Sequence, residues 1–411
     1  MEESASIKRL KLSKFKLNAL LEVTQAINSN LTPDELIALT KKILVDDLNI
    51  GKILIFKRND EWHSILRTGA TQRELDAINV EEDLIPVQDI SFVTVTENPA
   101  LEGFDIIIPV YHNNQPLAFV IIGDIEEGEG VSPVIKHLNF IQTLTNIVVV
   151  AIENIRLFQE SLAQERLKKE LELARKMQNL LIPDNDKLPR NSCVEVSGFY
   201  QPHYSIGGDY YDCIRLSKSS YGFCMADVSG KGISAALLMA NFQANLRALF
   251  TQDIPLENLV RNLNERVIEN AHGEKFITLF VAKYDCEKKT LEYINAAHNP
   301  PVAYMTTAKK MVKLPSNTVG IGMLDEMPNV QVESLSLHGR TKLICYTDGL
   351  SELPDNQGNE IGTRYIERDI ANEASIAENL KKLIASQEIN PENDRLFDDV
   401  SILGIDMKIP G

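Results

Sequence analysis

The sequence predicts a protein of mixed α and β structure in three parts: an N-terminal α+β domain, a helical linker and a C-terminal α/β sandwich. Three observations carry this prediction. Apolar residues recur at helical spacing early in the chain, short apolar runs between turn residues follow, and a glycine-free stretch precedes a second set of strands and helices. The predicted boundaries are 14–152, 153–183 and 184–411, in a chain whose length suits two or three domains.

The N-terminal domain begins with helical periodicity. Residues 17–48 predict two helices, with a break at 28–31 and a cap at Thr32 directly before Pro33. The runs GKILIFKR, EWHSILRTG and FDIIIPVYHNNQPLAFVIIGDI predict strands, with HNNQ at the tip of a hairpin. A further helix is expected to start near Ser132. The order helix, strands, helix is typical of an α+β domain.

Residues 153–183 predict one long helix. They contain no glycine, and their only proline is the last residue. Apolar residues lie three or four positions apart up to Leu162, but the next, Leu167, follows after a step of five, which is a stutter in a heptad pattern. We expect this helix to pair with a second copy of itself. The alternative is a solvated helix that lies on its own domain.

The C-terminal region predicts more strands than helices. Strands are expected over VEVSGFY, DYYDCIRL and YGFCMADV, and two helices follow over GISAALLMANFQANLRALF and PLENLVRNLNERVIEN. Further strands are expected over FITLFVAKYD, TLEYINAA, PPVAYM and TKLICYTDG, and a helix over ASIAENLKKLIASQ precedes a last strand, VSILGID. Helices in pairs between groups of strands favour an α/β sandwich over a parallel βαβ series.

Composition and charge narrow the function. The net charge of −16 argues against nonspecific binding of nucleic acid. The longest apolar runs are far shorter than the roughly 18–20 residues of a membrane helix, and no secretion signal is evident, so we expect a cytoplasmic protein without a membrane segment. The five cysteines are scattered without a CxxC pair, which argues against a disulfide framework or a structural zinc site.

Four acidic positions in the C-terminal region share one local pattern, because each lies where an apolar strand meets a polar or glycine-containing turn. They are Asp209 in IGGDYYD, Asp227 in MADVSGKG, Asp348 in ICYTDGLSE, and Asp398 or Asp399 in FDDVSIL. Aspartate and glycine also form ordinary turns, and any one of these sites is explained that way. Four in one domain point instead to carboxylates that converge on a hard divalent cation.

These segments resemble the SpoIIE-type branch of the metal-dependent protein phosphatases, the PPM superfamily. The resemblance runs in order through ARKMQNLLIP, IGGDYYD, ADVSGKGISAALLMA, FITLF, INAAHNPP, YTDGLSE and FDDVSIL, over about residues 174–405. It implies an α-β-β-α sandwich with the metal site at one end of its sheets. The N-terminal domain resembles a GAF sensor domain, and the combination resembles the layout of RsbU-like regulators.

The resemblance also implies a set of catalytic carboxylates and two divalent ions, Mn²⁺ or Mg²⁺. Asp227 would bridge the two ions, with the backbone carbonyl of Val228 as a further ligand, and Asp209 would lie on the side of the first ion. Asp348 and Asp398 would hold the second ion.

Asp399 lies beside that ligand and would support it. The family usually has threonine where Ser401 stands here, and serine keeps the hydroxyl. Two metals can activate one water for direct attack on phosphorus, without a phosphoenzyme.

Lys231 follows the glycine turn and is expected to begin a helix, where it would attract phosphate or simply be a surface lysine. His298 would act as a general acid or order its loop.

The resemblance further implies a substrate and a partner. RsbU-like enzymes remove phosphate from serine or threonine of a small anti-sigma antagonist of the STAS fold, and we expect a homodimer formed through the GAF-like domain and the linker helix. Two alternatives remain: a non-enzymatic dimeric scaffold with a degenerate phosphatase domain, and a GAF-linked nucleotide cyclase. The cyclase is disfavoured because Tyr210 and Tyr211 replace the residues that the GGDEF signature requires.

Overall fold

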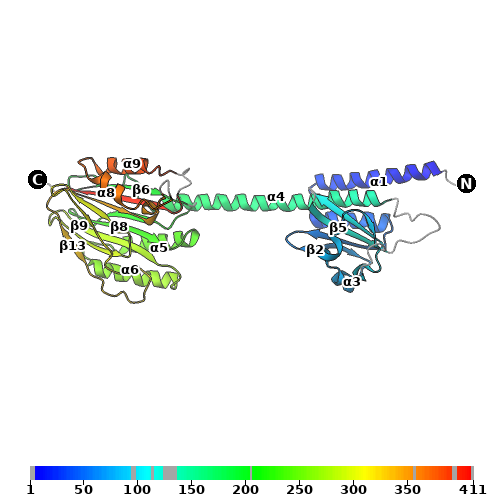
Figure 1. Ribbon diagram of the computed structural model, residues 1–411, viewed down its shortest axis with the longest axis horizontal. Coiled ribbons are helices and arrows are strands. Elements are labelled where there is room, and N and C mark those ends of the chain that lie inside the picture. The colour runs from blue at the N-terminus through cyan, green and yellow to red at the C-terminus, as the bar shows by residue number, and fades with distance from the viewer. Residues whose placement is uncertain are drawn as a thin grey trace. The chain divides into compact units, whose positions relative to one another are not determined.

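The computed structural model describes residues 5–93, 99–112, 115–123, 137–203, 206–354, 358–390 and 396–408 (Figure 1). The chain divides into two compact units, residues 1–166 and 167–411. The division falls within a single helix, α4 (Leu138–Asn179). It lies at the position where the heptad pattern of the sequence has its stutter.

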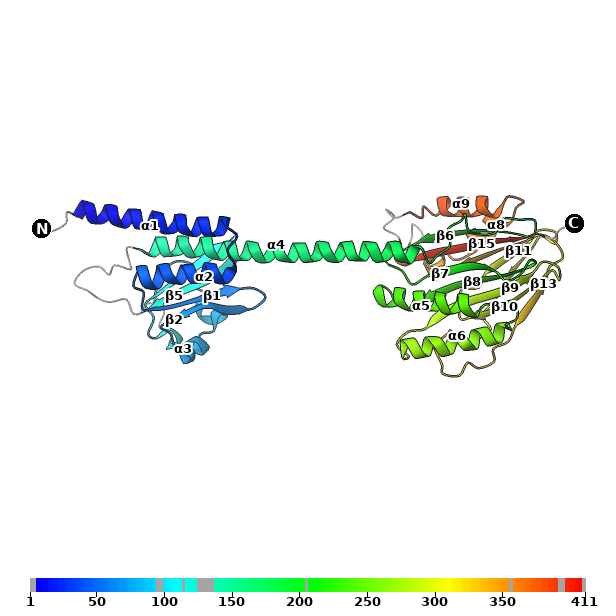
Figure 2. The ribbon, with the colours of Figure 1, turned by 180° about the vertical axis from the view of Figure 1, so that it is seen from behind.

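Unit 1 is a five-stranded antiparallel sheet with helices on both faces (Figure 2). The sheet has the order β2-β1-β5-β4-β3, and its strands are β1 (Lys52–Arg58), β2 (Trp62–Thr68), β3 (Ser91–Phe92), β4 (Ile106–His112) and β5 (Gln115–Gly123). Helices α1 (Ala5–Asn28), α2 (Pro33–Lys41) and the first part of α4 pack on one face, and α2 continues into η1 (Lys42–Asp47). The other face packs against α3 (Gln72–Ala77), η2 (Val80–Leu84) and η4 (Pro99–Leu101).

Local chemistry explains where these elements begin. The Thr32 hydroxyl accepts from the Glu35 amide, and the Glu35 carboxylate accepts from the Thr32 amide, so a capping box starts α2 at the predicted residue. The predicted strands of this unit are confirmed. Asn113, Asn114 and Ser132, which belong to the expected hairpin tip and helix start, lie outside the described residues.

Helix α4 is long and apolar enough, over one window of 18 residues, to cross a membrane by length and composition alone. Half of that window is buried. Its buried residues, which include Ile141, Leu144 and Val148, belong to the core of unit 1, as expected for the core helix of a globular domain.

Unit 2 is a sandwich of two five-stranded antiparallel sheets between two layers of helices (Figure 2). The first sheet, β13-β10-β9-β8-β7, contains β7 (Tyr210–Arg215), β8 (Ser220–Val228), β9 (Ile277–Asp285), β10 (Thr290–Ala296) and β13 (Glu333–Ser336). The second, β12-β11-β14-β15-β6, contains β6 (Val194–Gln201), β11 (Val302–Met305), β12 (Lys310–Lys313), β14 (Thr341–Tyr346) and β15 (Val400–Met407). Helices α5 (Ile233–Leu249) and α6 (Leu256–Ala271) cover the first sheet, and α8 (Arg364–Ile370) and α9 (Ile376–Ser386) cover the second.

Alternation along the strands builds two cores in this unit. In β15, Leu403 and Ile405 join the core between the two sheets, whereas Val400 and Ile402 join the core beneath α8 and α9. The predicted strands and helices of this region are present, and the short elements β12, β13, α7 (Asp348–Ser351) and α8 are additional.

The sequence argued against a disulfide framework, and the structure has one cysteine pair that the sequence did not predict. Cys193, directly before β6, is joined to Cys286, directly after β9, with Cα atoms 6.1 Å apart, which is an ordinary separation for a disulfide. The two residues are 93 positions apart in the chain, so no local spacing signals the pair. Cys213, Cys224 and Cys345 are free.

Candidate metal-dependent active site

The predicted acidic residues lie at one end of the sandwich because antiparallel strands bring their opposite ends together. In the first sheet, Asp209 directly precedes β7 and Asp227 is near the end of β8, and Tyr210 pairs with Ala226. In the second sheet, Asp348 follows β14 and Asp398 precedes β15, and these strands are neighbours. Each sheet therefore places carboxylates at the same end of the sandwich. We call this the acidic end, and it contains Asp209, Asp227, Asp348, Asp398 and Asp399.

The pKa of Asp227 depends on the charges of several neighbouring carboxylates. Burial, followed by the charges of Asp348, Asp398 and Asp399, raises its pKa to about 8, while a hydrogen bond with Asp209 acts in the opposite direction. Asp348, Asp398 and Asp399 all belong to the second sheet, so the two sheets share one electrostatic site. Without a cation, such a site keeps protons that isolated carboxyl groups would lose.

Asp209 is buried, with 2% of its surface exposed, and no basic side chain pairs with it among the described residues. Its Oδ2 accepts hydrogen bonds from the Thr347 hydroxyl at 2.7 Å and from the Ser401 hydroxyl at 2.7 Å. Burial, followed by the charges of Asp227 and Asp399, holds its pKa well above the usual range. The serine that replaces the family's threonine therefore performs a definite task, because it holds Asp209 in place.

Asp399 explains why two glycines precede Asp209. Its Oδ2 accepts from the Gly208 amide at 2.7 Å, and its Oδ1 accepts from the His203 amide at 2.9 Å. A Cβ atom at Gly207 would overlap Asp399 Oδ2 and the hydroxyl of Tyr200. The GGD turn thus requires glycine for close approach, and Asp399 holds the turn rather than projecting freely toward a cation.

Gly208 has a second neighbour. A Cβ atom there would lie 3.0 Å from the carbonyl oxygen of Val228, so the carbonyl predicted as a metal ligand faces the GGD turn.

Asp348 and Asp398 form the part of the site on the second sheet. Burial and then the charge of Asp398 raise the pKa of Asp348. Asp398 Oδ1 accepts from the Asp399 amide at 2.8 Å, and its Oδ2 lies 2.9 Å from Lys231 Nζ. Lys231 does not begin helix α5, which starts at Ile233 after Gly232. Its ammonium instead reaches Asp398 and the carbonyl of Phe397, so it neutralises part of the acidic end.

The chemistry of these donors fits a hard divalent cation. Carboxylates and a main-chain carbonyl are the oxygen ligands that Mg²⁺ and Mn²⁺ prefer, and among the described residues Lys231 is the basic side chain that pairs with an acid of this site. Within the described ranges, no three His, Cys, Asp or Glu side chains are grouped closely enough to enclose an ion as they stand. The acids are instead bonded to other groups of the protein. Asp209 accepts hydrogen bonds from hydroxyl groups, Asp399 accepts from main-chain amides, and Asp398 forms an ion pair with Lys231.

Sequence reasoning assigned no role to Gln178, near the end of α4. This side chain is 6% exposed, and its Nε2 donates to the Gly207 carbonyl at 2.5 Å while its Oε1 accepts from the Gly207 amide at 3.2 Å. The helix is therefore bonded directly to the GGD turn. Its place in the ARKMQNLLIP segment, which carries part of the family resemblance, was the available signal.

Comparisons with known proteins agree with this geometry. The family model described as Stage II sporulation protein E (SpoIIE) matches residues 217–408. "Phosphoserine phosphatase RsbU" of Bacillus subtilis is 25% identical over 252 residues, which cover 60% of this chain and 72% of that protein. "Phosphoserine phosphatase RsbP" of the same organism is 27% identical over 192 residues, which cover 45% of this chain and 46% of that protein.

Among solved structures, the SiaA-PP2C domain of Pseudomonas aeruginosa resembles the chain with a TM-score of 0.51 and 17% sequence identity. The likeness covers 60% of this chain and 99% of that domain, and it establishes the fold. The SpoIIE match includes Asp227, Asp348 and Asp398 of the acidic end, whereas Asp209 lies just before it. Over residues 217–408 this chain is therefore similar to the SpoIIE family, its fold is that of the PP2C domain, and its named relatives identify it as a protein serine/threonine phosphatase.

Proposed function

We propose that the acidic end of unit 2 binds two divalent ions, Mn²⁺ or Mg²⁺, and hydrolyses phosphoserine or phosphothreonine on a small regulatory protein. One observation carries this proposal: neighbouring strands of two different sheets bring carboxylates to a single place, where they raise one another's pKa values. A protein pays for such an arrangement in stability, and functional sites are where this is found.

The donor set assigns the ligands. Asp227 would hold both ions, the carbonyl of Val228 would assist, and Asp348 with Asp398 would complete the side toward the second sheet. When bound, the ions would lower the pKa of a water and draw the phosphoryl oxygens into line.

The protein's own groups have supporting roles. Thr347 and Ser401 keep Asp209 oriented, and Asp399 fixes the main chain of the GGD turn. Lys231 would exchange its contact with Asp398 for the substrate phosphate once cations occupy the site.

The substrate class comes from the relatives. RsbU and RsbP are named phosphoserine phosphatases, and a phosphorylated protein of the STAS type is the substrate that the resemblance implies. The net charge of the chain is −16, which disfavours a nucleic acid as the partner. A phosphoprotein could still bind, because the divalent ions would attract its phosphate group. We place this reaction in the cytoplasm, within a partner-switching pathway.

The direct test measures Mn²⁺-dependent release of phosphate from a phosphoserine protein by the full chain. Asp227→Asn should lower the rate more than about 100-fold, because a ligand to the cations is lost. The control Asp253→Asn changes an exposed carboxylate and should leave the rate unchanged. Equal rates for wild type and Asp227→Asn would disprove the assignment of the metal site.

We also infer that unit 1 is a GAF-like sensor that dimerises through its helices. Helix α1 exposes Leu10, Leu17 and Leu21, with exposed fractions of 53–71%. Helix α4 exposes Phe158 at 65%. Neither set of side chains contacts its own core, so both helices present an apolar face that needs a partner.

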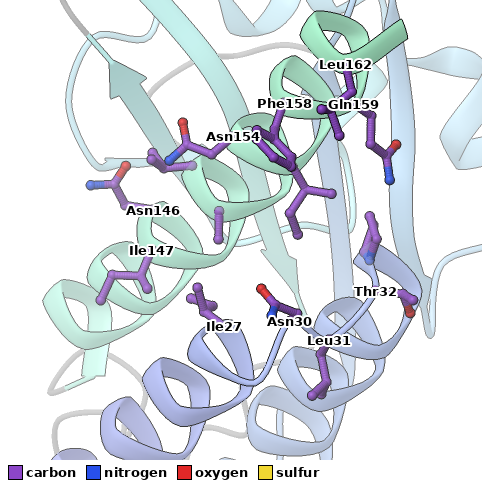
Figure 3. Close-up of a pocket in the computed structure, with 14 residues that line it drawn as sticks. Ile27, Asn30, Leu31, Thr32, Asn146, Ile147, Asn154, Phe158, Gln159 and Leu162 are labelled. Carbon is purple, nitrogen blue, oxygen red and sulfur yellow. The ribbon is translucent and has the colours of Figure 1, made fainter. Parts of the chain in front are cut away.

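A groove in the same region supports a second copy as that partner. It has a volume of about 950 Å³ and lies between α4 and the turn that joins α1 to α2 (Figure 3). Ile27 and Leu31 line one side, and Ile147, Phe158 and Leu162 come from α4. Because the groove and the exposed apolar residues of α4 are continuous, one helix of a second chain can cover both.

The dimer is tested by light scattering of the full chain at micromolar concentration. Phe158→Glu combined with Leu162→Glu should convert a dimer into a monomer, since two charges would enter the apolar contact. Gln164→Glu, on the same helix and also exposed, adds one charge outside the groove and should leave the dimer intact. A wild-type monomer, or a dimer that survives both glutamates, contradicts this part of the proposal.

A further inference from the structure

The connection between β10 and β11 is one of two segments that pass between the sheets at the acidic end, the other being the connection between β6 and β7 that contains the GGD turn. Residues 297–301 leave the first sheet after Ala296, which pairs with Leu279 of β9, and they enter the second sheet at Val302, which pairs with Ile344 of β14. The proposed metal ligands lie close to both ends of this connection. Asp227 pairs with Thr278 in the first sheet, and Asp348 follows Tyr346 by two residues in the second.

His298 fastens this connection to the first sheet. Its side chain is 3% exposed, and its Nδ1 lies 2.8 Å from the hydroxyl of Thr278, the residue directly opposite Asp227. Its main-chain amide donates to Asn295 Oδ1 at 2.9 Å, which fixes the loop to the end of β10. The ring is therefore placed against the strand pair that carries Asp227.

The same loop is fastened to the second sheet by its next two residues. Asn299 Nδ2 donates to the Ser351 hydroxyl at 3.1 Å, and that hydroxyl donates to the Asp348 carbonyl at 3.3 Å. The Tyr346 hydroxyl donates to the Pro300 carbonyl at 3.1 Å. Every one of these contacts is between uncharged groups or involves the neutral ring.

We propose that His298 and Asn299 form an inter-sheet clamp that sets the separation of Asp227 and Asp348, and thereby the affinity of the acidic end for divalent cations. The need for a clamp follows from charge. Carboxylates delivered by opposite sheets repel each other until a cation is bound, and the repulsion acts to part the sheets at this end. A clamp made of uncharged groups resists that parting without competing for the cation.

His298 acts through position rather than as a proton donor. Burial lowers its pKa to about 4, so the ring is neutral at physiological pH, and one of its nitrogens is already occupied by Thr278. It is a positioning residue, and this inference rests on the proposed metal site.

The test measures Mn²⁺ binding to the full chain by calorimetry without substrate. His298→Phe keeps an aromatic ring but removes the contact with Thr278, and Asn299→Ala removes the contact with Ser351. Each should weaken Mn²⁺ binding by about 10–100-fold, as loss of groups that orient metal ligands does. The lost phosphatase activity should return as Mn²⁺ is raised to saturation, with an unchanged KM for the phosphoprotein.

Thr306→Val is the matched control. It removes a 2.8 Å hydrogen bond to the Arg340 carbonyl at the opposite end of β11 and should lower the melting temperature without changing Mn²⁺ affinity. If His298→Phe does not fold, Asn299→Ala, at a half-buried position, decides the question. Variants that melt earlier but bind Mn²⁺ as tightly as wild type overturn the clamp. Absence of Mn²⁺ binding by the wild type would instead overturn the proposed metal site.

Discussion

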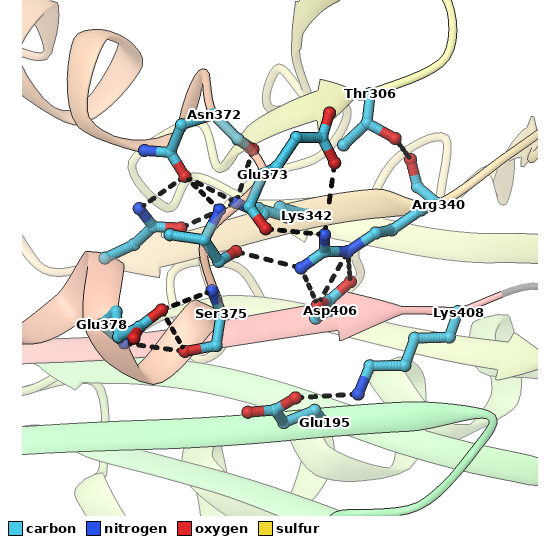
Figure 4. A network of polar contacts seen from close by, with 12 residues as sticks. Glu195, Thr306, Arg340, Lys342, Asn372, Glu373, Ser375, Glu378, Asp406 and Lys408 are labelled. Carbon is cyan, nitrogen blue, oxygen red and sulfur yellow. Dashed lines mark hydrogen bonds and ion pairs between the residues drawn. The ribbon is translucent and has the colours of Figure 1, made fainter.

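Two buried aspartates of unit 2, Asp406 and Asp209, are held in opposite ways. Asp406 in β15 has no exposed surface, and it receives Arg340 Nε at 3.0 Å and Arg340 Nη2 at 2.7 Å (Figure 4). Beside it, Lys342 donates to the carbonyl and side chain of Asn372 and to Asn379. Asp209 is almost as deeply buried, yet its partners are two hydroxyl groups, and its nearest charges are other carboxylates.

The difference separates a structural charge from a functional one. A buried charge is tolerated when an opposite charge and hydrogen bonds replace the lost water, as around Asp406. Buried acids without an opposite charge nearby destabilise the metal-free fold, and a bound cation would supply that positive charge.

The largest effect is expected at the structural pair. Arg340→Met should lower the free energy of unfolding by about 3–5 kcal/mol, because it leaves Asp406 buried without its cation. Arg266→Met removes an exposed ion pair with Glu269 and should cost less than about 1 kcal/mol. Urea unfolding of both variants measures the difference, and equal losses would show that Asp406 is not the structural charge described here.

Mn²⁺ should stabilise the fold through the functional site alone. At a free concentration about 100 times its Kd, one bound ion adds about 2.7 kcal/mol to the free energy of unfolding. Wild type and Arg340→Met should both gain this amount, whereas Asp227→Asn should gain almost nothing. Thermal unfolding with and without Mn²⁺ provides the measurement, and a similar gain in Asp227→Asn would place the ion elsewhere.

Removing one acid from the unbalanced site should stabilise the metal-free protein. The folded-state pKa of Asp227, about 8, lies above that of an ordinary aspartate, so its contribution to stability declines as pH rises from about 4 through 8. The free energy of unfolding of metal-free Asp227→Asn should therefore be about 1–2 kcal/mol higher than that of wild type at pH 8, and the two should be equal near pH 4. Unfolding in EDTA at several pH values tests it, and a constant difference would contradict the shifted pKa.

The smallest effect is expected at the end of the linker helix. Gln178→Ala removes both hydrogen bonds to Gly207 and should reduce kcat/KM about tenfold, because the GGD turn loses one of its supports. Gln164→Ala, which is exposed on the same helix, should match wild type. Steady-state kinetics at saturating Mn²⁺ separate the two, and an unaffected Gln178→Ala would show that Asp399 alone holds the turn.

The sequence predicted the strands and the acidic residues because both depend on local patterns. Alternating apolar residues define β8 and β15, and Asp227 and Asp398 are found at their ends by the same pattern. The Thr32 capping box is local as well, since its two residues lie three positions apart.

Contacts between distant residues could not be predicted in this way. Gln178 meets Gly207 across 29 positions, and Ser401 meets Asp209 across 192. Lys231 was expected at a helix start, yet it pairs with Asp398, which only the docking of the two sheets brings near. The pairing of Cys193 with Cys286 was missed for the same reason.

The position of β15 has a consequence for how the enzyme is made. This strand is the last in the chain, yet it lies between β14 and β6 in the second sheet and follows directly on Asp398 and Asp399. A ribosome-bound chain that stops before residue 396 lacks these acids and leaves β6 without a strand beside it. Because synthesis proceeds at about 5–20 residues per second, unit 1 has time to fold before unit 2 is complete. The acidic end can therefore form only after Asp398, Asp399 and β15 have left the ribosome, by which time all residues of unit 1 are available to fold.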